Sequence, residues 1–343
     1  MLLQLPTADL DLIAERVGSR WHALHGQRLL LTGGTGFIGK WLLGSFLHAN
    51  RKLGLDANVV VLSRDTAGFQ AKHPELAEAR EIEWLQGDVR DFELQAPCPY
   101  AIHAATDVVA TAAAGTVFDT CARGTSNVLA HVQDGGRILL LSSGAVYGRT
   151  PSTLERIPED YVGAPDPLLT SSAYGEGKRA SELLCAMAAA ERGVKTPIAR
   201  CFAFVGAHLP LDKHFAIGNF IGAALSNKPL IISGDGTPLR SYLDAADLVR
   251  WLWVLLFEGQ SARAYNVGGA EALSIEQLAH RVVAALGSKG AVQVAQQAKP
   301  GAPIQKYLPN LSRAEQELGL RCEIGLDEAI RRTARWHQEH SAP

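Results

Sequence analysis

Short, unbroken apolar runs alternate with longer segments of helical periodicity through the first half of the chain. Apolar runs of this length, bounded by glycine or polar residues, are typical of strands buried on both faces of a parallel sheet. The predicted strands are Arg28–Leu31, Asn58–Leu62, Ile82–Leu85, Tyr100–His103 and Arg137–Leu141. The predicted helices between them are Lys40–Ala49, 117–132 and 174–191. This alternation predicts an α/β fold with a doubly wound parallel sheet.

The pattern becomes less regular after about residue 205, where proline and glycine become frequent. Helical patterns still recur there, at 215–227, 245–258, 274–286, 312–319 and 326–340. We therefore expect a sheet domain at 27–205 and a smaller α/β substrate-binding lobe at 206–343, interleaved with the sheet domain.

A further helical segment, residues 1–26, precedes the first strand. Its apolar residues recur at the spacing of one helix face: Leu10, Ile13, Val17, Trp21 and Leu24. We expect an amphipathic helix that packs on the sheet domain or on a partner subunit, and the first arrangement is favoured.

A glycine-rich turn at residues 33–39 joins the first strand to the next helix. Its first glycine allows the tight turn, its third lets backbone approach a pyrophosphate, and its last lets the helix pack close to the strand. The helix start offers unpaired N–H groups and a positive dipole end to the phosphates. The turn therefore predicts a dinucleotide-binding sheet of the Rossmann type, with the pyrophosphate bound by Gly33, Gly36, Phe37, Ile38 and Gly39.

The second strand ends in Ser63-Arg64-Asp65, where an NAD site usually places an acid against the ribose 2′-hydroxyl. Ser63 and Arg64 instead suit a 2′-phosphate, through a hydrogen bond and a charge. Asp65 could pair with Arg64 or reach a ribose hydroxyl. The sequence predicts NAD(P) as the cofactor and favours NADP(H).

Two further strand ends carry residues suited to this cofactor. Asp88 can accept a hydrogen bond from the adenine amino group while Val89 packs against the ring. His103 ends the fourth strand and is interpreted as a structural histidine below the nicotinamide. The small residues that follow would let the backbone pass against the cofactor: Ala104, Ala105 and Thr106.

Ser142 and Ser143 end the fifth strand, and Tyr174 and Lys178 lie four residues apart on the next predicted helix, so they share one face. A neighbouring ammonium and a bound nicotinamide cation would stabilise the Tyr174 phenolate. Tyr174 can then exchange a proton with a substrate oxygen that Ser143 orients, while hydride moves to or from the nicotinamide. We predict Ser143, Tyr174 and Lys178 as catalytic residues, with Ser142, Tyr174 and Lys178 also contacting the cofactor.

Composition and charge exclude several other classes of protein. The net charge of −2 offers no basic field for nucleic acid or a membrane surface. No signal peptide or membrane-spanning run is recognisable. The five scattered cysteines form no CxxC pair, so we expect buried, reduced thiols in a cytoplasmic protein and no metal site.

Together these residues resemble the extended short-chain dehydrogenase/reductase family, which includes nucleotide-sugar epimerases, dehydratases and reductases. The resemblance runs from about Arg28 to the C-terminus. It rests on the glycine turn, Gly87-Asp88-Val89, Ser142-Ser143 with Val146-Tyr147-Gly148, Tyr174 with Lys178, Arg200, Phe202 and Gly206, Arg240-Ser241-Tyr242-Leu243 with Asp247, Tyr265-Asn266-Val267-Gly268-Gly269, and Glu317-Leu318-Gly319.

The resemblance implies Ser143, Tyr174 and Lys178 as the catalytic triad and places Phe202 beside the nicotinamide. It implies that Asn219 and Arg240 contact the diphosphate of a nucleotide-sugar substrate. It also implies a homodimer formed through two helices of each subunit, one of them carrying Tyr174 and Lys178.

This sequence departs from the family pattern in several places. Members that remove water from a sugar usually follow the catalytic hydroxyl with an acid pair, but here Gly144 and Ala145 follow Ser143, so 4,6-dehydration is not expected. Ala203 and Cys121 stand where the family usually has asparagine. Ser241 replaces the aspartate of the usual Arg-Asp-Tyr. We therefore expect either a different position of the substrate or a substrate other than a standard nucleotide hexose.

We therefore predict an NAD(P)-dependent epimerase or keto-reductase that acts on a nucleotide-activated sugar. Two alternatives remain: an NADPH-dependent reductase of a non-sugar carbonyl, which the loss of asparagine at Ala203 favours, and a non-catalytic dinucleotide sensor. Retention of Arg240 argues against the first alternative, and the Ser143, Tyr174 and Lys178 set argues against the second.

Overall fold

A computed structural model of the chain describes residues 2–76, 78–106, 112–213 and 215–340, which divide into two compact units. The first unit comprises Met1–Gly148, Gly163–Arg200 and Val249–Tyr265. The second comprises Arg149–Val162, Cys201–Leu248 and Asn266–Pro343. The chain therefore passes between the units more than once, and the boundaries expected from sequence, at residues 27, 205 and 206, stay predictions.

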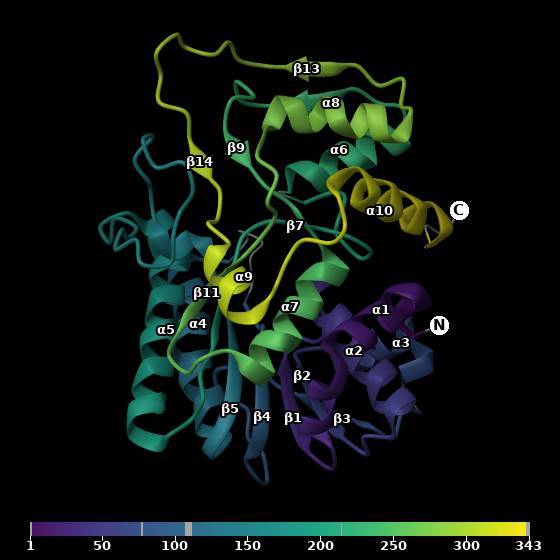
Figure 1. Ribbon diagram of the computed structural model, residues 1–343, viewed down its shortest axis with the longest axis vertical. Coiled ribbons are helices and arrows are strands. Elements are labelled where there is room, and N and C mark those ends of the chain that lie inside the picture. Colours follow the sequence, from purple (N-terminus) through teal and green to yellow (C-terminus); the bar gives the residue numbers. More distant parts are fainter. Residues whose placement is uncertain (1, 77, 107–111, 214, 341–343) are drawn as a thin grey trace. The chain divides into compact units, whose positions relative to one another are not determined.

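A seven-stranded sheet has the strand order β11-β6-β5-β4-β1-β2-β3 (Figure 1). Each described pairing from β5 to β3 is parallel, which confirms the predicted α/β fold. The seven strands are β1 (Arg28–Thr32), β2 (Asn58–Ser63), β3 (Ile82–Gln86), β4 (Cys98–His103), β5 (Val132–Ser143), β6 (Ile198–Cys201) and β11 (Ala264–Val267). Strands β6 and β11 are absent from the strands predicted above, because their apolar runs are short.

The order of strands reverses next to β1. From β1 the chain proceeds outward to β2 and β3, then returns to β4 on the other side of β1. Thr32, at the end of β1, is level with Leu62 of β2 and His103 of β4. Ligands of such sheets bind outside the carboxyl ends of the strands at this reversal.

Helices cover the sheet on both faces. On one face Leu30, Val60 and Ile138 share a buried core with Val128 of α4 and Cys185 of α5. Side chains alternate along a strand, so their neighbours point to the opposite face, where they are equally buried. The helices of this unit are α1 (Thr7–Val17), α2 (Phe37–Leu53), α3 (Thr66–Lys72), α4 (Ala114–Ala130), α5 (Ala173–Arg192) and α7 (Ala245–Glu258), which enters it at Val249.

The N-terminal segment packs on this sheet unit. α1 ends at Gly18, and the 3₁₀ helix η2 (Gly18–Leu24) continues it, with the five apolar positions of the predicted helix face all buried. The Trp21 ring lies 4.6 Å from the ring of Trp253, whose Nε1–H donates to Ser45 Oγ at 2.8 Å. Leu5 packs over Gly44 of α2, where a Cβ would lie only 2.6 Å from Leu5 Cδ1.

The second unit combines short strands with helices. Its sheets pair β7 (Phe204–Val205) with β10 (Leu243–Asp244), β8 (Leu230–Ile232) with β13 (Val292–Val294), and β9 (Leu239–Arg240) with β12 (Leu273–Ser274) and β14 (Lys306–Tyr307). Its helices include α6 (Ala216–Leu225), α8 (Ile275–Leu286), α9 (Ser312–Leu318) and α10 (Leu326–His340). These elements make the smaller α/β lobe that the sequence predicts.

Asp244 is a buried acid in the core of this second unit, with 4% of its surface exposed. Burial raises its pKa to about 7, and the nearby charge of Asp247 acts in the same direction. Its Oδ1 accepts a hydrogen bond from the Ala246 N–H at 2.8 Å. The folded chain therefore holds a proton on Asp244 at pH values where the unfolded chain has released it.

This raised pKa predicts that the free energy of unfolding falls as pH rises from the unfolded value of 3.8 to about 7, by at most about 1.4 kcal/mol per pH unit. Asp244→Asn keeps an oxygen for the Ala246 N–H but cannot ionise, so it should remove this component of the decline. Denaturant unfolding of both proteins across this range measures the difference. Parallel pH profiles would show that Asp244 does not titrate as described.

Candidate active site

The turn after β1 is shaped by close backbone approaches. Gly33 has φ +72°, and a Cβ there would lie 2.7 Å from the carbonyl carbon of Ala104. A Cβ on Gly39 would overlap the carbonyl oxygen of Gly33. Gly36 differs, because the nearest atom to a Cβ there is Gly33 O at 3.4 Å, an ordinary contact. Packing within the protein therefore explains the glycine at 33 and 39, but not at 36.

The start of α2 fits a bound anion. Gly36 is the N-cap residue of α2 and provides no side-chain acceptor for the first-turn N–H groups of Phe37, Ile38 and Gly39. Gly36 also lines a cavity, so a side chain at this position would occupy space in front of the helix start. Unpaired N–H groups and the helix dipole favour a phosphate there, so the turn fits a dinucleotide pyrophosphate.

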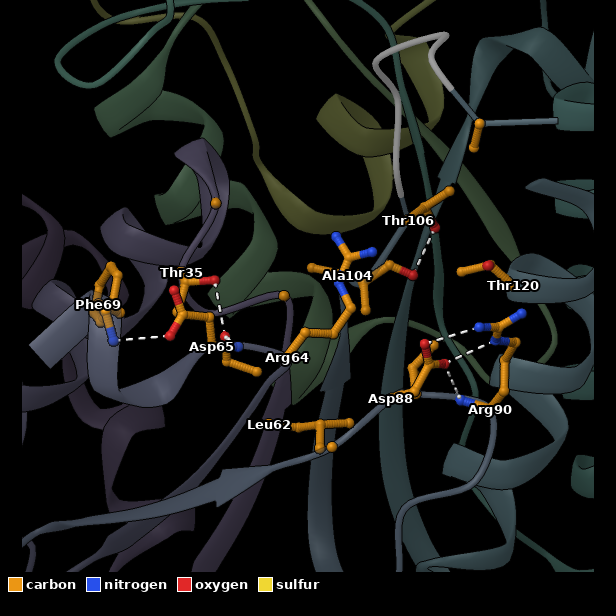
Figure 2. Close-up of a pocket in the computed structure, with 18 of the residues that line it drawn as sticks. Thr35, Leu62, Arg64, Asp65, Phe69, Asp88, Arg90, Ala104, Thr106 and Thr120 are labelled. Carbon is orange, nitrogen blue, oxygen red and sulfur yellow. Dashed lines mark hydrogen bonds and ion pairs between the residues drawn. The ribbon is translucent and has the colours of Figure 1, made fainter. Parts of the chain in front are cut away.

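The cavity has a volume of about 510 Å³ and opens where the strand order reverses. Its walls come from the segments that follow β1, β2, β3 and β4 (Figure 2). A cavity of this size, bounded by a glycine turn, is suited to part of a nucleotide cofactor. The predicted cofactor residues that line it are Gly33, Gly36, Ser63, Arg64, Asp88, Val89, Ala104, Ala105 and Thr106.

On one side of this cavity lies the segment that follows β2. Ser63 Oγ is 3.5 Å from Thr35 Oγ1 of the glycine turn. Asp65 is the N-cap of α3, because its Oδ1 accepts from the Gly68 N–H at 2.8 Å. Arg64 is exposed and lines the cavity between these groups and Asp88, as Figure 2 shows. Asp65 thus has a structural role as a cap, while Ser63 and Arg64 face the space for the cofactor.

The opposite side is dominated by an ion pair. Arg90 grips Asp88 with two nitrogens, Nε to Oδ1 at 2.8 Å and Nη2 to Oδ2 at 2.9 Å, and also reaches Asp119 (Figure 2). These bonds hold the pKa of Asp88 down at about 2, so Asp88 is an anion at neutral pH. Each carboxylate oxygen can accept a second bond, so the predicted contact with the adenine amino group remains open to Asp88.

Lys178 links the cavity to the end of β5. Its buried ammonium donates to Thr106 Oγ1 and to the carbonyl oxygen of Leu141, both at 2.7 Å. The Thr106 hydroxyl donates in turn to Ala105 O at 2.8 Å. These two bonds fix the position of the ammonium at the end of β5.

Tyr174 lies in the first turn of α5, one turn before Lys178, as the spacing predicts. The first turn of α5 lies against the short helix η4 (Gly144–Tyr147), since a Cβ on Gly175 would be 2.8 Å from Ala145 O. Ser143 is the N-cap of η4, and its Oγ accepts from the Ala145 N–H at 3.1 Å. This bond uses Ser143 Oγ as an acceptor and fixes the hydroxyl at the end of β5.

A buried network holds α5 against the sheet below these groups. Ser142 Oγ donates to Glu182 Oε1 at 2.6 Å, and Glu182 forms a two-point ion pair with Arg200. The Arg200 guanidinium lies 4.8 Å from the centre of the Tyr147 ring. Removing one partner of such a pair leaves a buried charge, so the network fixes the position of α5. Ser142, predicted to contact the cofactor, donates to Glu182 in this structure.

His103 is a buried structural residue, as interpreted from sequence. Its Nδ1 lies 2.8 Å from Thr32 Oγ1 and its Nε2 lies 3.1 Å from Thr125 Oγ1. Burial lowers the pKa of His103 to about 3, so the ring is neutral. Thr32 Oγ1 also accepts from the Ala105 N–H at 3.2 Å, which fixes the backbone beside the cavity.

The remaining predicted residues belong to the second unit. Arg240 lies in β9, with its guanidinium 5.5 Å from the centre of the Tyr307 ring. Tyr307 in turn lies 4.5 Å from the ring of half-buried Phe202. Asn219 is exposed on α6. Arg240, Tyr307 and Phe202 thus form one cluster in this unit, and Asn219 lies on a separate helix.

Several residues near the cavity were not found by sequence reasoning. Arg90 lies two residues after Asp88, and its backbone N–H donates to Asp88 Oδ1. This two-residue spacing, typical of an aspartate turn, is the one local sequence signal for the contact between them. Glu182 lies four residues after Lys178 on the same helix face. Lys40, Lys72 and His73 line the cavity, but no sequence pattern connects α2 and α3.

The five cysteines are free thiols, four of them buried. Within the described part of the chain, no group of three or more histidine, cysteine or acidic residues is arranged to hold a metal ion. No described helix is long and apolar enough to cross a membrane.

Comparison with known proteins places the chain among sugar-modifying enzymes. UDP-glucuronic acid decarboxylase 6 of Arabidopsis thaliana is 30% identical over 312 residues, which cover 89% of this chain and 87% of the relative. UDP-glucuronic acid decarboxylase 1 of Xenopus tropicalis is 27% identical over 332 residues, covering 92% and 74%. A double mutant of DesIV, a dTDP-glucose 4,6-dehydratase from Streptomyces venezuelae solved with NAD bound, matches with a TM-score of 0.77 and 26% identity, covering 91% of this chain and 97% of that one.

The sequence profile of the NAD dependent epimerase/dehydratase family matches residues 29–268. This range begins in β1 and includes the glycine turn, Ser143, Tyr174 and Lys178. The resemblance to the extended short-chain dehydrogenase/reductase family is confirmed, and the chain belongs to the NAD-dependent epimerase/dehydratase family.

Proposed function

We propose that this chain is an NAD(P)-dependent epimerase or keto-reductase that acts on a nucleotide-activated sugar. One observation carries the proposal. The buried Lys178 ammonium is held by Leu141 O and Thr106 Oγ1, on the helix that carries Tyr174 and at the edge of the dinucleotide cavity. A fixed cation beside a tyrosine favours the phenolate, and a fixed phenolate is the base that carbonyl–alcohol interconversion requires.

In this proposal the residues divide the work between proton transfer and orientation. Tyr174 takes a proton from a sugar hydroxyl, or returns one to a carbonyl oxygen. Ser143 donates its hydroxyl proton to the same oxygen and orients it. Lys178 stabilises the phenolate by its charge and contacts the nicotinamide ribose. The nicotinamide, when bound, would accept hydride from, or donate hydride to, the sugar carbon that bears this oxygen.

The substrate contacts are proposed from the second unit. The Arg240 guanidinium suits the diphosphate of a nucleotide sugar, because its planar donors match two phosphate oxygens. Phe202 is proposed beside the nicotinamide and Asn219 beside the diphosphate. We also propose that the protein acts in the cytoplasm.

The residues after Ser143 limit the chemistry. Gly144 and Ala145 carry no ionisable side chain, so neither can protonate a departing hydroxyl. This supports epimerisation or reduction over 4,6-dehydration.

Decarboxylation of a UDP-linked uronic acid is the second candidate, because several relatives are UDP-glucuronic acid decarboxylases. It would use the same Tyr174 to take the proton of a sugar hydroxyl that is oxidised to a ketone as its hydride passes to the bound dinucleotide. The carboxylate β to that ketone would then leave as carbon dioxide, and the enolate that remains would take up a proton.

Tyr174→Phe removes the proposed acid/base and should lower kcat by about 10²- to 10⁴-fold, with little effect on dinucleotide affinity. The assay offers UDP- and dTDP-linked hexoses, their 4-keto forms and UDP-glucuronic acid, with sugar products and carbon dioxide both recorded. Tyr100→Phe, in β4 away from the cavity, is the matched control and should retain full turnover.

The products separate the candidate reactions. Epimer formation with tightly held cofactor identifies an epimerase, consumption of added NAD(P)H identifies a reductase, and carbon dioxide release identifies a decarboxylase. Turnover of simple carbonyls alone would point to a non-sugar reductase, and tight cofactor binding without turnover would point to a sensor. Near wild-type turnover by Tyr174→Phe would refute the proposed mechanism.

We also propose that the protein forms a homodimer through α4 and α5, which pack side by side in the first unit (Figure 1). These helices expose large apolar side chains: Phe118 at 43%, Leu183 at 63% and Met187 at 44%. Apolar residues grouped on neighbouring helices are typical of an interface with another subunit.

Leu183→Glu would place a charge in this interface and should convert a dimer to a monomer in sedimentation velocity experiments. Leu53→Glu is the matched control, because Leu53 is 39% exposed at the end of α2, away from this surface. A wild-type protein that sediments as a monomer at micromolar concentration would contradict the proposal.

A further inference from the structure

A continuous series of buried hydrogen bonds crosses the sheet unit from β1 to α5. His103 of β4 lies at its centre, with Nδ1 2.8 Å from Thr32 Oγ1 and Nε2 3.1 Å from Thr125 Oγ1. Thr125 of α4 continues the series, because its Oγ1 lies 2.9 Å from Ser181 Oγ of α5. None of these four residues, called here the imidazole chain, is more than 1% exposed. Polar groups buried this deeply are stable only when each donor meets an acceptor.

The α5 end of the imidazole chain determines the direction of its bonds. Ser181 Oγ lies 3.0 Å from Cys121 O and 3.1 Å from Gly177 O. A carbonyl oxygen can only accept a hydrogen bond, so the one hydroxyl proton of Ser181 points to these two oxygens. The bond between Ser181 and Thr125 must then use the Thr125 proton. Thr125 Oγ1 is therefore an acceptor for the group on its other side.

This direction selects the tautomer of His103. Because Thr125 Oγ1 accepts, the proton of the His103 ring lies on Nε2. Burial lowers the pKa of His103 to about 3, so the ring is neutral and Nδ1 carries no proton. Nδ1 therefore accepts from the Thr32 hydroxyl, whose oxygen accepts from the Ala105 N–H at 3.2 Å. All the bonds thus point the same way, from the backbone after β4 toward α5.

Both ends of the imidazole chain adjoin a second link between the same two segments. Ala105 is followed by Thr106, and Gly177 is followed by Lys178, whose ammonium donates to Thr106 Oγ1 at 2.7 Å. The backbone after β4 is therefore attached to α5 at two consecutive residues, once directly and once through the imidazole chain. Ala105 and Thr106 line the dinucleotide cavity, so this double attachment relates the cavity wall to the position of Lys178.

We propose that His103, as its neutral Nε2–H tautomer, is a positioning residue that holds the wall of the dinucleotide cavity at a fixed distance from Lys178. This inference rests on the proposed function, in which the cavity binds a dinucleotide and Lys178 contacts its nicotinamide ribose. His103 is buried, so it acts through its two threonine partners. Protonation of the ring, or transfer of its proton to Nδ1, would remove the acceptor of the Thr32 proton and break the series of bonds.

The tautomer is tested by nitrogen-15 NMR of full-length protein with labelled histidine, freed of any bound dinucleotide. His103 should show a protonated Nε2 and an unprotonated Nδ1 from about pH 8 to about pH 5, because its pKa lies below this range. Thr125→Ser keeps the hydroxyl and identifies the His103 signals by their small shift. An Nδ1–H tautomer, or a His103 ring that takes up a proton above about pH 5, would overturn the inference.

Thr125→Val tests the positioning role, because it keeps the shape of the side chain and removes the hydroxyl between His103 and Ser181. The dissociation constants of NADH and NADPH are measured by nicotinamide fluorescence, and the dinucleotide that wild-type protein prefers is compared among variants. Thr125→Val and Ser181→Ala should each weaken its binding by about three- to tenfold. Thr125→Ser restores the hydroxyl and should bind within about twofold of wild type.

Ser45→Ala is the matched control for Ser181→Ala. Ser45 is also a buried helical serine of the first unit, which donates to Leu42 O at 3.0 Å and accepts from Trp253 Nε1–H at 2.8 Å. It does not line the cavity. Its loss should lower the unfolding temperature and leave dinucleotide affinity unchanged, which separates a positioning effect from a general loss of stability.

Wild-type affinity in Thr125→Val or Ser181→Ala would overturn the positioning role and leave the proposed function standing. The same conclusion would follow if Thr125→Ser or Ser45→Ala weakened binding as much as Thr125→Val. Failure of wild-type protein to bind either dinucleotide would overturn the proposed function, whereas the NMR measurement on wild-type protein decides the tautomer independently of binding.

Discussion

The contact between the turn after β1 and the backbone after β4 determines the geometry of the whole site. Gly33 approaches Ala104 so closely that no side chain fits between them, and this contact lies where the strand order reverses. The approach brings the first turn of α2 and the segment Ala104–Thr106 to the same cavity. Lys178 of α5 donates to Thr106, so this backbone contact also influences where α5 attaches.

The two sides of the cavity carry different charged side chains. Asp88 and Arg90 neutralise each other on the adenine side. Lys40, Arg64 and Lys72 line the other side, where Asp65 is committed to the cap of α3. The cavity is therefore bordered by an internal ion pair on one side and by three basic side chains on the other.

Sequence patterns predicted the parts of this protein that depend on local regularity. The strands β1 to β5 have apolar runs long enough to identify. The glycine turn could be recognised because the backbone approaches at positions 33 and 39 leave no room for a side chain, so glycine must appear there in the sequence. β6 and β11 have only four residues each, and α3 has only seven, which is too few to show a helical repeat of apolar residues. The grouping of Lys40 with Lys72, and of Ser142 with Glu182 and Arg200, depends on how distant segments fold together, so no spacing along the chain could indicate it.

The central claim is that the turn at residues 33–39 is a cradle for a dinucleotide. Gly36→Val tests it most directly, because a Cβ there meets no protein atom closer than 3.4 Å and yet faces the cavity. Calorimetric titration with NADPH and NADH, alongside thermal unfolding, is the measurement. We predict an unchanged unfolding temperature and a loss of affinity of about tenfold or more for both dinucleotides. A Gly36→Val protein that binds either dinucleotide as tightly as wild type would show that the turn does not bind the dinucleotide.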